Sequence, residues 1–204
     1  MKQIALYPIL VLLVISIGSV QQGRAAERPD TKPSEALADA TTDNIEQVSP
    51  LDDLAWMIGH WVDRGEDVTI TTNCSWTKNG KFITRSFRVA TNNEVTLEGT
   101  QVVGWDPIEH RIRSWTFDSE GGFGEGRWIQ DGNRWLVKTS FVLASGDRAS
   151  ALNVLTYVDP DTFRWQSIDR EIGGELQPNI PEVTVVRLEA EENVSQAAAK
   201  EESK

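Results

Sequence analysis

Short runs of β-branched and aromatic residues, interleaved with polar ones, fill most of the chain between positions 51 and 188. Two-residue signals at Asn79-Gly80 and Asp131-Gly132 predict tight hairpins with type I′ turns, and Asp-Pro, Gly-Gly and Ser-Gly pairs mark further reversals. The pattern predicts ten strands, at residues 56–62, 67–77, 82–90, 94–105, 110–118, 123–130, 133–143, 148–158, 162–171 and 182–188. An open sheet of that many strands would expose two edges, so we expect an all-β fold, an antiparallel up-and-down β-barrel.

The segments that flank this region have a different composition. Residues 1–26 combine an apolar run with small residues near its end, which predicts a signal peptide cleaved after Ala25 or Ala26 and a periplasmic or secreted protein. The alternative is an uncleaved anchor, because the apolar run approaches the length that spans a bilayer. Residues 27–50 and 189–204 are acidic and poor in aliphatic side chains, so we expect a disordered linker and a disordered tail.

Composition and charge narrow the classes of function. The chain has 204 residues, of which 39% are hydrophobic and 25% charged, and this suits one globular domain with a sizeable core. A formal net charge of -11 opposes binding to nucleic acid and to anionic membranes, since both attract surplus Lys and Arg. The single cysteine, Cys74, excludes an intramolecular disulfide, so burial alone must stabilise the core.

Motifs for catalysis or metal binding are not found in the sequence. It contains no Gly-x-Ser-x-Gly elbow, no phosphate-binding glycine loop that opens a helix, and no His-Glu-x-x-His. Its two histidines, His60 and His110, have no carboxylates at ligand spacing, so we expect no metal site. Gly124 and Gly126 are expected to let a strand bend or a neighbour approach closely.

Four charged residues share the strand parity of large apolar neighbours. If the apolar parity points inward, the barrel lumen would hold Arg85, Arg113, Glu125 and Asp169 among the aromatic residues Phe87, Trp115, Phe141 and Trp165. Charges buried in this way must be paired or must bind something. The alternatives are a self-satisfied structural network and a bulge that flips the parity and turns these groups toward water.

One short segment carries a resemblance to a known family. Ile58-Gly59-His60-Trp61 resembles the Gly-x-Trp element that opens the first strand of lipocalins and related calycin barrels, where the Trp closes one end. The segments 112–118 and 121–126 resemble a lipocalin-like domain of unknown function in exported bacterial proteins. In some of those proteins it follows a SnoaL-like domain, which we do not expect here because only the signal and linker segments precede Leu51.

The resemblance implies a calycin-type fold, export, and structural roles for Gly59 and Trp61, and it implies no catalytic residues. Nitrobindin-like barrels, which this chain resembles in strand count, bind haem through a histidine near the last strands. Both histidines of this chain lie in its first half, so we expect no haem and no other cofactor.

Three functions remain open at this point. The first is non-catalytic binding of a small amphipathic or acidic apolar ligand in the lumen, with its acid held by Arg85 and Arg113. The second is an enzyme in which a buried Glu125 or Asp169 acts as general acid or base. The third is a filled barrel that acts through a protein partner. An empty lumen above about 300 Å³ would favour binding, and a filled one would favour the third function.

Overall fold

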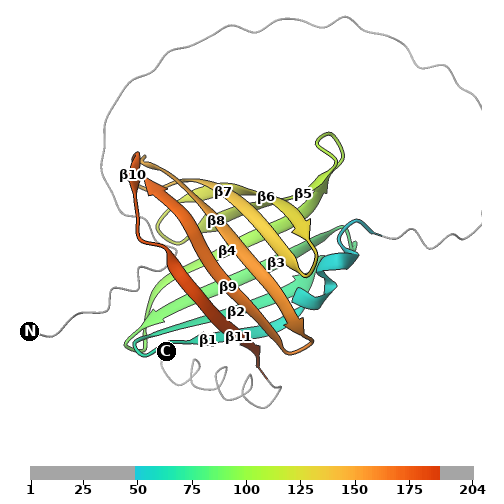
Figure 1. The fold of residues 1–204 in the computed structure, drawn as a ribbon, viewed down its shortest axis with the longest axis horizontal. Helices are drawn as coiled ribbons and strands as arrows, with labels where there is room; N and C mark the ends of the chain where they lie inside the picture. Colours follow the sequence, from blue (N-terminus) through green and yellow to red (C-terminus); the bar gives the residue numbers. More distant parts are fainter. Residues whose placement is uncertain (1–48, 189–204) are drawn as a thin grey trace, which may run out of the picture.

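The computed structural model describes residues 49–188, which form a closed antiparallel β-barrel with almost no helix (Figure 1). The all-β barrel predicted from the sequence is therefore confirmed. The expected signal peptide, most of the expected linker and the whole expected tail lie outside the described residues. The strands are β1 (Gly59–Arg64), β2 (Val68–Trp76), β3 (Phe82–Thr91), β4 (Glu94–Asp106), β5 (Arg111–Asp118), β6 (Phe123–Asp131), β7 (Arg134–Val142), β8 (Arg148–Asp159), β9 (Thr162–Ile172), β10 (Glu175–Leu176) and β11 (Ile180–Arg187).

The barrel closes through its last strand. Strands β1 to β9 each pair with their neighbours in the chain, and β11 lies between β9 and β1. Trp61 of β1 pairs with Arg187 of β11, and Val185 of β11 pairs with Phe163 of β9. The two-residue β10 pairs only with β9 and stands outside the ring of ten. Each strand of the ring thus has two partners, which leaves no long exposed edge.

Most predicted strand limits lie within two residues of the observed ones. The first strand begins later than predicted, because Asp52–Met57 forms a 3-10 helix, η1. The turn chemistry also differs in detail. Gly80 and Gly132 have positive φ, but consecutive positive φ values, as in a type I′ turn, occur at Asn92 and Asn93, with φ of 51° and 68°, and at Gly173 and Gly174, with φ of 59° and 88°.

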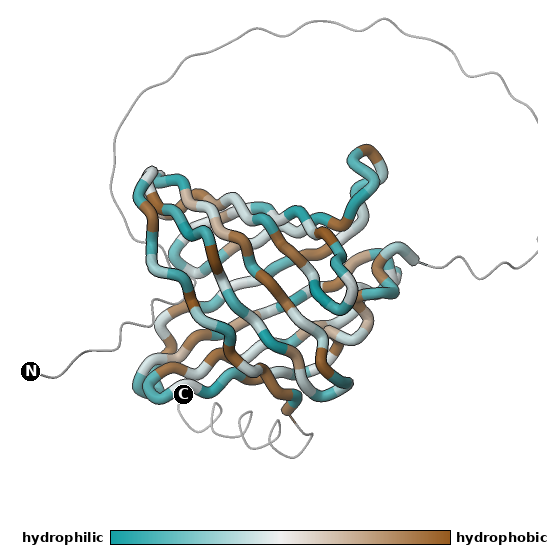
Figure 2. The backbone as a smooth tube through the Cα atoms, viewed as in Figure 1, coloured by the Kyte–Doolittle hydropathy of each residue, from teal (hydrophilic) through white to brown (hydrophobic). Residues whose placement is uncertain are grey.

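One end of the barrel is sealed by a hydrophobic cluster. Leu51, Leu54 and Met57, in and just before η1, reach the interior and are almost completely buried. They join inward side chains of many strands, among them Trp61, Cys74, Ile83, Val103, Trp128, Trp135, Val137, Leu155 and Phe163. Figure 2 shows the alternation of hydrophobic and hydrophilic positions along the strands.

The opposite part of the barrel has a smaller core. Phe87, Val89 and Leu97 form this second cluster, with Val68 and Ile70 packed against it. The space between the two clusters holds the candidate site. Within residues 49–188, no helix has the length and apolar character needed to span a membrane.

Candidate functional site

A cavity of about 170 Å³ lies inside the barrel, and every strand of the ring contributes to its wall. This is smaller than the 300 Å³ expected of a wide lumen, because the sealed end fills much of the interior. It is close to the roughly 150 Å³ of an engineered apolar protein cavity that accepts benzene. The cavity, which is partly open to solvent, therefore suits one small ring or a short alkyl chain.

Arg85 points from β3 into this cavity. Its neighbours of the same parity, Ile83 and Phe87, are buried core residues, and its guanidinium carbon lies 5.9 Å from the Phe87 ring centroid. Burial lowers the pKa of Arg85 because desolvation disfavours its charged form. Among residues 49–188, no acceptor makes a hydrogen bond or ion pair with this guanidinium.

The residues beside Arg85 do not neutralise it. Cys74 lies directly opposite on β2, and Gln101 lies opposite on β4. Burial raises the pKa of the Cys74 thiol, more than the nearby Arg85 and Arg187 charges lower it, so the thiol stays neutral at pH 7. The Gln101 amide nitrogen donates to Thr116 Oγ1 at 3.1 Å and Ser114 Oγ at 3.4 Å. Arg85 is therefore a cation without an ion-pair partner among the described residues, although Asp63 and Glu171 line the same cavity.

Three of the four aromatic residues named from the sequence line the cavity: Phe87, Phe141 and Trp165. The Phe141 ring lies against the backbone of Gly124, where an added Cβ would come within 2.2 Å of Phe141 Cδ2. The close approach expected at this glycine is therefore present. Trp115, the fourth aromatic residue, does not line the cavity.

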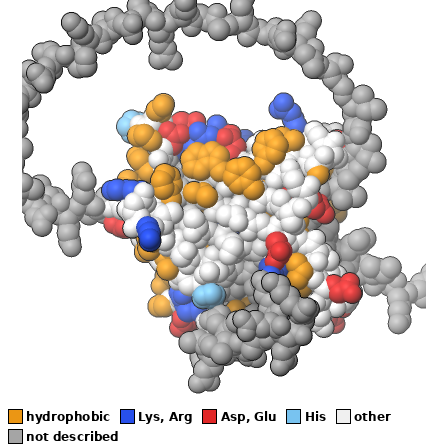
Figure 3. All heavy atoms as spheres, turned by 180° about the vertical axis from the view of Figure 1, so that it is seen from behind, with side chains coloured by type: hydrophobic (Ala, Val, Ile, Leu, Met, Phe, Trp, Pro, Cys, Tyr) orange, Lys and Arg blue, Asp and Glu red, His pale blue; other side chains and the backbone are white. Residues whose placement is uncertain are grey.

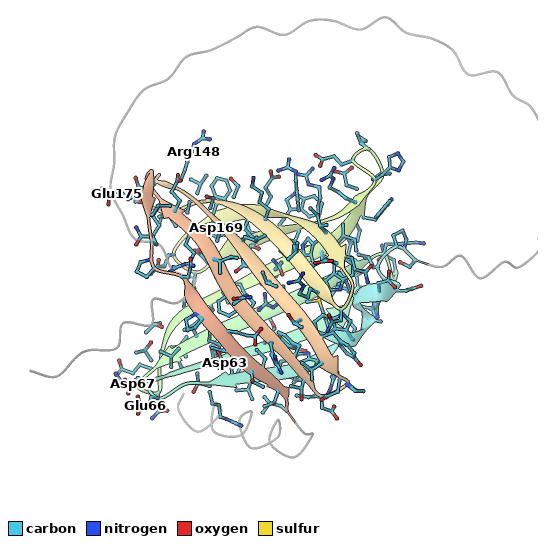
Figure 4. All side chains as sticks on the ribbon, viewed as in Figure 1. Asp63, Glu66, Asp67, Arg148, Asp169 and Glu175 are labelled. Carbon is cyan, nitrogen blue, oxygen red and sulfur yellow. The ribbon has the colours of Figure 1, made fainter. Side chains whose placement is uncertain are left out.

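The end of the barrel opposite η1 carries charged residues. Figure 4 shows Asp63, Glu66 and Asp67 on one side of this end, and Arg148 and Glu175 on the other. Asp63 lines the cavity, and burial raises the pKa of its carboxyl group. Arg170 also lines the cavity and donates to the Pro178 carbonyl oxygen at 2.6 Å. Alternation did not single out Asp63 or Arg170 in the sequence.

Arg113 and Glu125 lie on the outer face, so the prediction that they face the lumen was wrong. On β5, Ile112 and Ser114 are buried and Thr116 lines the cavity, which places Arg113, Trp115 and Phe117 outside. The reason is that small inward residues leave room for the large Trp128 ring, whose Nε1 donates to Ser114 Oγ at 3.0 Å. On this strand the aromatic residues therefore lie on the outward face.

Arg113 belongs to an ion-pair network on that outer face. It contacts Asp106 at 2.9 Å and Glu109 at 3.5 Å, and it pairs with Glu125, which also contacts Arg127 at 3.4 Å. The hydrogen bond from Arg113 is the main reason that the pKa of Asp106 is lowered. Figure 3 shows hydrophobic side chains gathered beside acidic and basic ones on the side of the molecule hidden in Figure 1. The network is structural, like the ion-pair alternative, but it lies on the outer face and leaves Arg113 Nε buried without a hydrogen-bond partner.

Asp169 is also outside the lumen, because a bulge interrupts the alternation of β9. The pairing of β8 with β9 shifts register between Ser150 and Leu152, and Asp169 has a φ of 50°. Its side chain is exposed, and its backbone N–H donates to Asn179 Oδ1 at 3.1 Å. The parity therefore changes, and Arg170 points inward in its place. For Asp169, the structure therefore shows the alternative in which a bulge turns the side chain toward water.

The Gly-x-Trp corner has a partner that the sequence did not reveal. Trp61 is buried, its Nε1 donates to the Met57 carbonyl oxygen at 2.8 Å, and the Arg187 guanidinium lies 4.2 Å from its ring centroid. Arg187 also donates to the Ile58 carbonyl oxygen at 2.7 Å. Gly59 has a φ of 128°, and a Cβ there would lie 2.1 Å from Arg187 Nη1. No local pattern links Arg187 to a corner so distant in the chain.

The histidines take no part in a ligand cluster. His60 and His110 are exposed, and no three His, Cys, Asp or Glu side chains of residues 49–188 could together hold a metal ion. No protein-family model matches the chain, and no curated protein matches it. The site is therefore interpreted from its own residues and geometry.

Proposed function

We propose that this protein is a non-catalytic binding barrel whose lumen takes up a small, acidic, apolar molecule. The observation that carries this proposal is Arg85, a cation that lines the cavity and makes no ion pair or hydrogen bond among the described residues. An unpaired buried charge is costly, and an acid group on a ligand would offset that cost through charge-assisted hydrogen bonds. The aromatic wall of Phe87, Phe141 and Trp165 would contact the apolar body of the ligand.

The alternatives have less support. Glu125 and Asp169, on which the enzyme alternative depended, do not line the cavity. A barrel that acts only through a protein partner would not need an unpaired arginine beside an internal cavity. The cavity of about 170 Å³ is below the roughly 300 Å³ that would favour binding on volume alone, so the proposal rests on Arg85 and the proposed occupant is small.

The test compares two arginines of the same strand that face opposite ways. Arg85→Met should weaken binding of 3-phenylpropanoate at least tenfold, because a hydrogen-bonded charge contributes about 1.5–3 kcal/mol. Arg88→Met, on the outer face beside Glu98, should leave the affinity unchanged. Isothermal titration calorimetry measures both dissociation constants. Binding that is absent from the parent, or equal in Arg85→Met and the parent, would overturn the proposal.

The stability of the same variants gives a second readout. Removing an unpaired buried cation should leave the free energy of unfolding unchanged or raise it. A loss of several kcal/mol in Arg85→Met would instead indicate a hidden structural partner for this guanidinium.

The calycin-type assignment and export are part of the same proposal. The packing of Trp61 against η1 and Arg187 supports a corner that closes one barrel end, as the Gly-x-Trp resemblance implies. The signal pattern in residues 1–26 supports secretion to the periplasm or beyond. N-terminal sequencing of the purified protein should give Ala26 or Glu27 as the first residue, and a retained Met1 would favour the anchored form.

A further inference from the structure

Asn153 and Ser167 form a polar pair on the wall of the cavity. They lie directly opposite one another in the pairing of β8 with β9, and both line the cavity. Only 8% of Asn153 and 1% of Ser167 is exposed. Directly opposed residues on one face of a sheet have Cβ atoms about 4.5–5.5 Å apart, so the two side chains can reach one common atom.

Hydrogen bonding fixes the orientation of the Asn153 amide. Thr139 Oγ1 donates its single proton to the Ala151 carbonyl oxygen at 3.0 Å, so toward Asn153 it can only accept. The atom that faces it at 3.4 Å must therefore be the amide nitrogen, Nδ2. This leaves Asn153 Oδ1 as the atom free to accept a hydrogen bond.

Both free atoms of the pair are buried and unsatisfied. Asn153 Oδ1 and Ser167 Oγ have no hydrogen-bond partner among the described residues. Buried polar atoms without partners are rare in folded proteins, and each one requires a physical explanation. The pair offers one acceptor, the carbonyl oxygen, and one hydroxyl that can donate.

We infer that this pair binds a hydroxyl group of the ligand. A hydroxyl can donate its proton to Asn153 Oδ1 and accept the proton of Ser167 in the same place. A carboxylate cannot donate to the amide oxygen, and an ammonium group cannot accept from the serine. The inference rests on the proposed function, because it takes Arg85 as the partner of the acid group.

The order of strands places the two polar contacts on opposite walls. In the ring of ten strands, β3 and β8 are separated by the same number of neighbours in both directions. Arg85 on β3 and Asn153 on β8 therefore come from opposite sides of the ring, and both line the same cavity. The ligand class is a compact apolar hydroxy acid, with its acid and hydroxyl at opposite ends of a small body.

Two probes that differ by one hydroxyl group test this inference. The parent protein should bind 3-(4-hydroxyphenyl)propanoate at least tenfold more tightly than 3-phenylpropanoate, since each buried unsatisfied atom gains a partner. Asn153→Leu should remove this preference, so that the variant binds the two probes with affinities within about twofold of each other. Ser167→Ala should reduce the preference, and Ser140→Ala, at an exposed position of β7, should leave it unchanged.

The outcomes separate this inference from the proposed function. Suppose that 3-phenylpropanoate binds in an Arg85-dependent way and that the added hydroxyl group does not increase the affinity. This result would overturn the inference and indicate that water alone binds the Asn153–Ser167 pair. It would leave the proposed function standing. Failure of both probes to bind would overturn both. The ratio of the two affinities in the parent protein needs no variant, so it decides the question even if Asn153→Leu does not fold.

Discussion

Trp61 is the largest side chain that the barrel buries almost completely. Its ring packs edge-on against Phe163 at a centroid distance of 5.0 Å, and Arg187 covers it. Trp61→Ala should therefore lower the free energy of unfolding by about 3–5 kcal/mol, as expected for loss of a buried aromatic ring. Urea denaturation followed by circular dichroism measures the change.

Trp105 provides the matched control for this substitution. It lies near the end of β4 and is 37% exposed, so Trp105→Ala should cost much less than Trp61→Ala. Equal losses in the two variants would contradict the role of Trp61 in closing the barrel end.

Asp63 should make stability depend on pH. Burial raises the pKa of its carboxyl group above 3.8, so between that value and the raised pKa the folded protein binds more protons than the unfolded chain. The stability contributed by Asp63 therefore falls as pH rises through this window and stays lower above it. Asp63→Asn should melt above the parent at pH 7, and the difference should shrink below pH 3.8.

Thermal melts at pH 3.5 and pH 7 measure this effect. Asp67→Asn, at an exposed residue of the following turn, is the control and should change the melting temperature less. A lower melting temperature of Asp63→Asn at pH 7 would mean that the ionised carboxylate makes a stabilising contact.

Strand β6 shows how one element shapes the lumen without adding polar groups to it. Gly124 leaves room for the Phe141 ring, and a Cβ there would also lie 2.5 Å from the Ser140 carbonyl oxygen. Gly124→Ala should therefore cost about 1–3 kcal/mol of folding free energy, as overpacking usually does. It should also weaken binding of 3-phenylpropanoate, because the displaced ring moves into the cavity.

A double variant distinguishes the ring from the backbone in this contact. Adding Phe141→Leu to Gly124→Ala should restore part of the lost stability, since the smaller side chain yields space. Strictly additive losses in the double variant would show that the two residues do not compete for the same volume.

The whole molecule depends on closure by β11. Val185 is buried on this strand and pairs with Phe163, so Val185→Asp places an unpaired charge inside the ring. We expect a loss of about 3–5 kcal/mol in the free energy of unfolding. Thr184→Asp, at the adjacent exposed position, should stay within about 0.5 kcal/mol of the parent. Urea denaturation compares the two, and similar losses would contradict the inward placement of Val185.

At the scale of the molecule, the sequence was sufficient for the fold. Alternation and turn residues determined the strands and their antiparallel order, because these depend on neighbours close in the chain, and the two exposed edges of an open sheet implied closure. The same local pattern placed Arg85 correctly: Ile83, Phe87 and Val89 share its parity, and all three are buried.

Only the tertiary structure decided which face of β5 and β6 points inward and where β9 changes parity. Alternation divides the residues of a strand between two faces. Which face points inward depends on the space left by side chains of the other strands. On β5 the small inward Ser114 leaves space for Trp128, while Trp115 lies outside. Three further features depend on strands that folding brings together, so no local pattern could have predicted them. They are the bulge at Asp169, the contact of Arg187 with Trp61, and the unsatisfied pair of Asn153 and Ser167.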